Sequence, residues 1–158
     1  MIRFGELNRR HLLAGVFLLP LVGIAATPNR TLIEVWKSPT CGCCKDWIAH
    51  LESNGFDVKT HEVSESAKAA QRSKLGMPEK LGSCHTALVQ GYVLEGHVPA
   101  REIQRLLSQR PQALGLSVPG MPVGSPGMDG PAYGGRKDPY TVLLVQRDGS
   151  TAIYRVYA

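Results

Sequence analysis

Short apolar segments alternate with segments of helical periodicity along most of the chain. Strands are predicted where β-branched and apolar residues cluster or alternate with polar ones, and helices where apolar positions recur three and four residues apart. This pattern predicts strands at 32–36, 56–63, 86–90 and 92–95 and helices at 45–54, 64–75 and 99–107. Two further strands, at 140–145 and 151–157, flank Asp148-Gly149, a pair typical of hairpin turns.

The order strand, helix, strand, helix, strand, strand, helix predicts an α/β fold of the thioredoxin-like type. The last two strands would add a C-terminal β-hairpin. The stretch 116–131 is rich in glycine and proline and has no periodic apolar face, so we expect a Gly/Pro/Met loop there. A chain of 158 residues favours one domain, here 27–158, that forms a core without needing disulfides.

The first 26 residues have the features of an export signal. Arg9 and Arg10 precede an apolar run that ends in small residues. The paired arginines resemble a twin-arginine leader, but Asn8 and Ala14 depart from the usual pattern, so the Sec and twin-arginine routes both stay open. The apolar run is short for a membrane span and contains Pro20, which favours a cleaved signal over a retained anchor. We therefore expect a periplasmic protein without stable membrane insertion.

The mild net charge and the lack of common catalytic motifs argue against several classes of function. The formal net charge is +5, and the predicted leader contributes three arginines and one glutamate, so the remainder carries +3. This mild charge, without a basic stripe of interleaved aromatic residues, argues against nucleic-acid binding. No serine-histidine-acid set, phosphate-binding glycine loop or paired carboxylates stand out.

Three of the four cysteines fall within four residues, at the predicted turn from the first strand into the first helix. Free N–H groups and the dipole of a helix N-terminus lower thiol pKa values. The spacing of Cys41 and Cys44 suits a dithiol couple or two metal ligands. The intervening Cys43 has no use in a simple redox pair, but it suits a soft metal that bridges thiolates.

The fourth cysteine, Cys84, precedes His85 at the start of the third predicted strand. Thioredoxin-like proteins place a loop facing the Cys-x-x-Cys turn there, so we expect Cys84 to meet the other three thiols. His85 would be an imidazole ligand or a hydrogen-bonding neighbour. Met121 and Met128 offer thioethers to a soft monovalent ion. The alternative is that both side chains are semi-buried and only anchor the loop. His97 is expected to support the site from outside the ligand set.

Copper is the ion that this donor set favours. Cu(I) prefers two or three thiolates and is readily bridged by sulfur, and imidazole also suits Cu(II). Three alternatives stay open: a pair of structural disulfides, a zinc-stabilised interaction module, and a thiol-disulfide oxidoreductase with Cys41 as the attacking thiol and Cys44 as the resolving one. The donors exceed what one tetrahedral zinc ion uses, which weighs against zinc.

Four segments in the same order resemble the CopG-like family of exported metal-binding proteins associated with bacterial copper resistance. They are 36–44, 83–87, 96–99 and 118–128. The resemblance implies a thioredoxin-like fold and copper bound by Cys41, Cys43, Cys44 and Cys84, with His85 and the methionine loop close by. It implies copper ions and other periplasmic copper-handling proteins as partners. Whether such a protein is a copper oxidoreductase or a non-enzymatic metal binder stays open.

Overall fold

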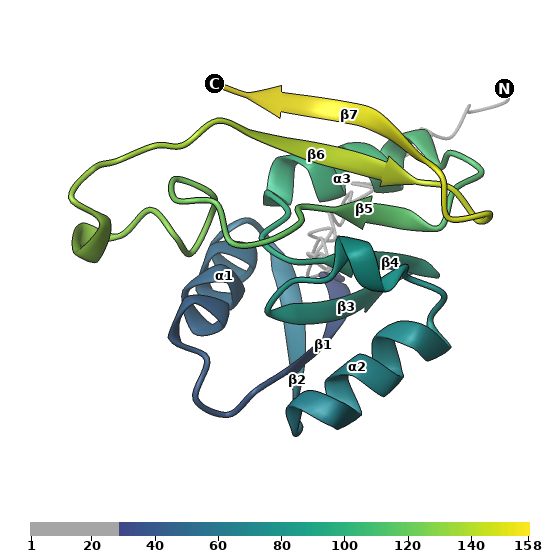
Figure 1. Ribbon diagram of the computed structural model, residues 1–158, viewed down its shortest axis with the longest axis horizontal. Helices are drawn as coiled ribbons and strands as arrows, with labels where there is room; N and C mark the ends of the chain where they lie inside the picture. The colour runs from purple at the N-terminus through teal and green to yellow at the C-terminus, as the bar shows by residue number, and fades with distance from the viewer. Residues whose placement is uncertain (1–28) are drawn as a thin grey trace, which may run out of the picture.

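The computed structural model describes residues 29–158, so the export signal predicted at 1–26 lies outside the described residues. The architecture is mixed α/β, as predicted (Figure 1). Among residues 29–158, no helix is long and apolar enough to cross a membrane. The elements are β1 (Thr31–Lys37), α1 (Gly42–Ser53), β2 (Phe56–Glu62), α2 (Glu65–Lys74), η1 (Glu79–Leu81), β3 (His85–Val89), β4 (Tyr92–Glu95), α3 (Ala100–Gln109), β5 (Gly115–Ser117), η2 (Pro131–Tyr133), β6 (Tyr140–Val145) and β7 (Thr151–Tyr157).

The seven strands within residues 29–158 form one sheet in the order β2-β1-β3-β4-β5-β6-β7. β1 and β2 are parallel, as are β4 and β5, and the other neighbours are antiparallel. The register between β1 and β3 positions the site, because Lys37 at the end of β1 pairs with His85 at the start of β3. The turn that follows β1 carries Cys41, Cys43 and Cys44 and is here called the cysteine turn. It therefore lies beside Cys84, the residue that directly precedes β3.

The helices cover both faces of the sheet (Figure 1). Successive side chains on a strand point to opposite faces, so each strand contributes to two layers. On one face, Trp47 and Leu51 of α1 and Ile103 and Leu106 of α3 pack with the strands in the larger apolar core. On the other face, Met77 and other residues around η1 pack against β4 and β6 in a smaller cluster.

The prediction of a loop at 116–131 is wrong for residues 116 and 117, because Gly115–Ser117 form β5 between β4 and β6. Three residues are too few to show a period, and all three are buried, so they carry no alternation of polar and apolar positions. The remaining residues before β6, 118–139, are here called the cover segment. Residues 125–128 of this segment are buried, and the Cα of Gly127 lies close to the α1 backbone near Cys43 and Trp47.

Candidate metal centre

The cysteine turn places three sulfurs around the first turn of α1. Cys41 is the N-cap residue and makes no side-chain capping hydrogen bond, while Cys43 and Cys44 lie in the first turn. Cys44 is fully buried, and Cys41 and Cys43 are partly exposed. The free N–H groups of a helix N-terminus favour negative charge, so this position stabilises thiolates.

The sulfurs of all four cysteines lie within 4.8 Å of one another, which confirms that Cys84 meets the other three. Cys41 and Cys44 form a disulfide, whereas Cys43 and Cys84 are free thiols. The alternative of two disulfides is therefore wrong for this structure. The Sγ of Cys43 lies 3.6 Å from the Sγ of Cys41, and only Cys43 carries a thiol hydrogen, so Cys43 is the donor in this contact.

Two buried imidazoles flank the sulfur of Cys84. The Nδ1 of His97 lies 2.7 Å from the carbonyl oxygen of Pro126 and must donate to it, which leaves Nε2 as an acceptor in the neutral ring. This Nε2 lies 3.0 Å from the Sγ of Cys84. His85 approaches the same sulfur with Nδ1 at 3.3 Å, and its ring packs on Trp47 with centroids 4.1 Å apart.

Burial sets the protonation states of this group. Desolvation lowers the pKa of His97 and holds the pKa of His85 well below its ordinary value. Both rings are therefore neutral near pH 7, the form in which imidazole binds metals. Burial, together with the neighbouring Cys43, raises the pKa of the Cys84 thiol to about 12. Cys84 thus keeps its proton in the metal-free protein, and metal binding must release that proton.

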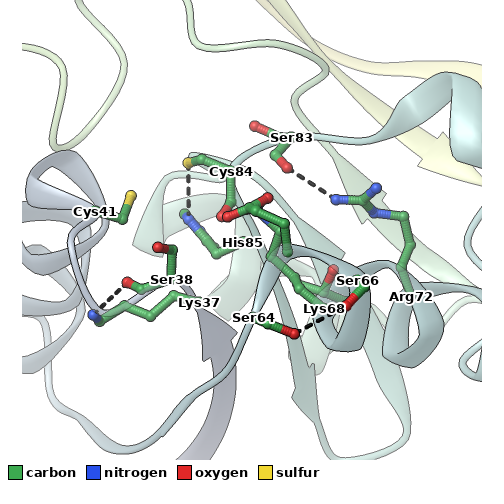
Figure 2. Close-up of polar contacts among 12 residues, drawn as sticks. Lys37, Ser38, Cys41, Ser64, Ser66, Lys68, Arg72, Ser83, Cys84 and His85 are labelled. Carbon is green, nitrogen blue, oxygen red and sulfur yellow. Dashed lines mark hydrogen bonds and ion pairs between the residues drawn. The ribbon is translucent and has the colours of Figure 1, made fainter.

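Helix α2 holds the backbone on both sides of the Cys84 α-carbon (Figure 2). The Nζ of Lys68 donates to the carbonyl of Cys84 at 2.9 Å, and one turn later Arg72 donates to the carbonyl of Ser83, also at 2.9 Å. Glu95 of β4 is fully buried and accepts from Arg72 at 2.8 Å and from the backbone N–H of Ser83 at 2.6 Å. These contacts fix the Cys84 sulfur opposite the cysteine turn.

An open cleft of about 400 Å³ gives access to the sulfurs. Cys41 and Cys84 both line it, and Figure 2 shows them facing each other from the cysteine turn and the segment before β3. Met121 also lines the cleft and is 52% exposed. Met128 is not among the lining residues; its sulfur accepts a hydrogen bond from the Tyr133 hydroxyl at 3.2 Å. The structure thus places Met121 at the cleft that Cys41 and Cys84 line, and Met128 beside Tyr133 within the cover segment.

Two sets of potential metal ligands result, and Cys84 belongs to both. One set is the four cysteine sulfurs, and the other is Cys84, His85 and His97. The sequence placed His97 outside the ligand set and did not single out Lys68, Arg72 or Glu95. The Cys41 and Cys44 sulfurs are at bonding distance, the arrangement that a dithiol/disulfide couple requires.

Comparisons with known proteins give one family match and two matching solved structures. Residues 81–128, which include Cys84, His97 and part of the cover segment, match a family described as a protein of unknown function, DUF411. A solved structure of copper resistance protein CopG, form 1, is 45% identical, with a TM-score of 0.74 over 81% of this chain and 98% of that one. Form 2 is 46% identical, with a TM-score of 0.73 over 82% and 99%. No curated protein matches.

Proposed function

Because the chain belongs to the CopG family of copper resistance proteins, we propose that it is an exported protein that binds Cu(I) in the periplasm. The observation that carries the proposal is the convergence of four cysteine sulfurs within 4.8 Å. Thiolates are the ligands that Cu(I) prefers, and a compact group of four can bridge more than one ion. Met121 and Met128 would add thioethers, Met121 from the cleft and Met128 after release from Tyr133.

The disulfide supports a redox role as part of this proposal. Oxidation of the Cys41 and Cys44 thiols to a disulfide releases two electrons and two protons, enough to convert two Cu(II) ions to two Cu(I) ions. The reverse reaction consumes the same electrons and protons. The protein would then interconvert the two oxidation states in addition to binding copper. If copper-loaded protein loses its metal on each mild cycle of oxidant and reductant, the redox part of the proposal fails.

The direct test is an anaerobic titration of the reduced protein with Cu(I) against a competing chelator. Wild-type protein should take up more than one copper per chain, and Cys84→Ser should bind far more weakly because it removes the sulfur that belongs to both ligand sets. A parallel titration with zinc tests the zinc-stabilised alternative, in which chelation would unfold the protein. Weak copper uptake, or uptake indifferent to Cys84, would refute the proposal.

A thiol-disulfide oxidoreductase is the second candidate, and the Cys41–Cys44 disulfide is the observation that favours it. Cys41 faces the cleft and Cys44 is fully buried, so a dithiol partner would attack Cys41 and release Cys44 as the leaving thiolate. This function predicts insulin reduction that survives both Cys43→Ser and Cys84→Ser. Copper binding predicts that Cys84→Ser is damaging.

The proposal also includes a thioredoxin-like fold and a periplasmic location. The order β1-α1-β2-α2-β3-β4-α3 supports a thioredoxin-like domain at 27–158, extended by β5 to β7 and the cover segment. Export and signal cleavage would place this domain in the periplasm, where other copper-handling proteins would exchange copper with it.

A further inference from the structure

Three loops meet at the end of the sheet opposite the cysteine turn (Figure 1). They are the β3–β4 turn at 90–91, the link from α3 to β5 at 110–114 and the β6–β7 turn at 146–150. Strand register brings them together, because Val93 pairs with Gly115 and Gly115 pairs in turn with Val145. Residues of all three loops line a cavity of about 300 Å³, and Arg110 and Arg147 are among them.

The two arginines of this cavity have no carboxylate partner. Five of the eight arginines in residues 29–158 form an ion pair with a carboxylate, and the exceptions among the described residues are Arg110, Arg147 and Arg155. Arg110 donates to the neutral amide oxygen of Gln90 at 3.2 Å. No described acidic residue lines the cavity, and the carboxylate of Asp148 accepts two hydrogen bonds within the β6–β7 turn. The cavity therefore carries two positive charges that its own lining does not neutralise.

Backbone strain is concentrated at the same cavity. Gln90 at φ +46° and Arg110 at φ +47° are the two residues other than glycine with a positive φ among residues 29–158. Glycine or asparagine is the usual residue at both places, because Gln90 and Gly91 form a tight hairpin turn and Arg110 is the C-cap of α3. Residues held in this conformation cluster at ligand sites, where the surrounding structure maintains them. Both side chains line the cavity and bond each other, a role that the backbone conformation alone does not explain.

Hydrogen bonds hold the three loops in place around the cavity. The hydroxyl of Tyr92 donates to the carbonyl of Pro111 at 2.9 Å. The backbone N–H of Val93 donates to the carbonyl of Leu114 at 3.0 Å, and the N–H of Leu114 donates to the carbonyl of Val145 at 2.8 Å. A site formed before its ligand arrives loses little conformational entropy on binding.

We propose that this cavity, here called the arginine pocket, binds a small anion of the phosphate or polycarboxylate class. The planar N–H donors of a guanidinium match the paired oxygens of phosphate and carboxylate groups. Two arginines without a carboxylate partner favour a ligand with at least two negative charges. The volume lies at the lower end of the roughly 300–1,000 Å³ typical of small-molecule sites, which suits an anion of this size. The pocket lies at the other end of the sheet from the metal centre and is independent of the proposed copper function.

The test is a titration of the metal-free, disulfide-containing protein with sodium phosphate and, separately, with sodium citrate, at an ionic strength held constant with sodium chloride. NMR spectra follow the backbone N–H groups of Gly91 and Gln112, which line the pocket, and calorimetry measures the affinity. Arg110→Gln and Arg147→Gln each remove one guanidinium. Arg155→Gln is the matched control, because it removes the same charge from an arginine that also lacks a carboxylate partner but lies outside the pocket.

At least one of the two anions should bind saturably, with one anion per chain, and shift the N–H signals of Gly91 and Gln112. Arg110→Gln and Arg147→Gln should each weaken this affinity by roughly 10-fold or more, because hydrogen bonds to charged groups are the stronger ones. Arg155→Gln should change the affinity by less than about twofold. If neither anion gives saturable shifts in the wild-type protein at millimolar concentrations, or if Arg155→Gln loses as much affinity as the pocket variants, the arginine pocket is refuted. The wild-type titration needs no folded variant.

Discussion

Replacing Gly127 with alanine tests how firmly the cover segment is seated on α1. Gly127 has a φ of +84°, a conformation that residues with a Cβ rarely adopt. A Cβ at this position would lie 2.6 Å from the carbonyl oxygen of Cys43 and 2.7 Å from the backbone nitrogen of Trp47. Both atoms belong to the backbone of α1, so neither can move aside as a flexible side chain would.

Two costs add in this variant. The left-handed conformation costs an alanine about 1–2 kcal/mol, and overpacking of a filled contact costs about 1–3 kcal/mol. We therefore expect Gly127→Ala to lower the free energy of unfolding by about 2–5 kcal/mol, or by less if the cover segment lifts off α1. Lifting would also draw the Pro126 carbonyl away from His97 and speed amide exchange across 118–139.

Urea unfolding of the metal-free, disulfide-containing protein measures this loss. Gly130→Ala is the matched control in the same segment, because Gly130 has a φ of −71° and no atom of the described chain lies within 4 Å of a Cβ built there. The control should stay within about 0.5 kcal/mol of wild type. If Gly127→Ala equals Gly130→Ala in both unfolding free energy and amide exchange, the cover segment does not rest on α1 as described.

Three other perturbations test the surroundings of the site. Glu95→Leu leaves the guanidinium of Arg72 without its buried partner and should lower the free energy of unfolding in urea by about 3–5 kcal/mol. A loss below about 1 kcal/mol would show that Glu95 does not hold Arg72 in place beside Ser83. Lys68→Met removes the hydrogen bond to the Cys84 carbonyl and should weaken Cu(I) affinity in chelator competition, whereas the exposed Lys74→Met should not. Burial lowers the pKa of the three histidines His50, His85 and His97 below 6.5, so the unfolded chain binds more protons than the folded one as pH falls. The free energy of unfolding of the metal-free protein should accordingly be greatest above pH 6.5 and decline on acidification. His50→Gln should make this decline shallower. An unfolding free energy that stays constant between pH 7.5 and 5.5 would show that these rings are not held neutral by burial.

Local patterns were sufficient to predict most elements of this fold. The predicted start of the second helix at residue 64 is its N-cap, where the Ser64 hydroxyl accepts from the N–H of Ala67 at 3.2 Å. The segments from β1 to α3 and the two last strands each span enough residues to show a period of two or 3.6. β5 was not predicted, because a strand of three buried residues is defined by the strands that pair with it, and this pairing cannot be read from the local sequence.

The site was predicted only in part for a related reason. The clustered cysteines are visible as a motif, but His97 becomes a ligand candidate only through strand register. Thr86 pairs with Glu95 across the β3–β4 turn, and counting two residues outward on each strand sets Cys84 opposite His97. Lys68 and Arg72 could not be found in this way, because their contacts depend on how α2 packs against the sheet.

The cover segment lies between β5 and β6, so its length can change without a change in the sheet. These two strands are antiparallel neighbours, and Ser117 pairs with Leu143, so the segment leaves and re-enters the sheet at adjacent points. Doubling the length of such a closed loop costs only about 0.6 kcal/mol in entropy. Insertions and deletions in the exposed parts of the segment, outside the buried residues 125–128, would leave the strand pairing beneath unchanged. A change in the exposed length of this segment would therefore alter what lies over the cysteine turn while β5 and β6 stay paired.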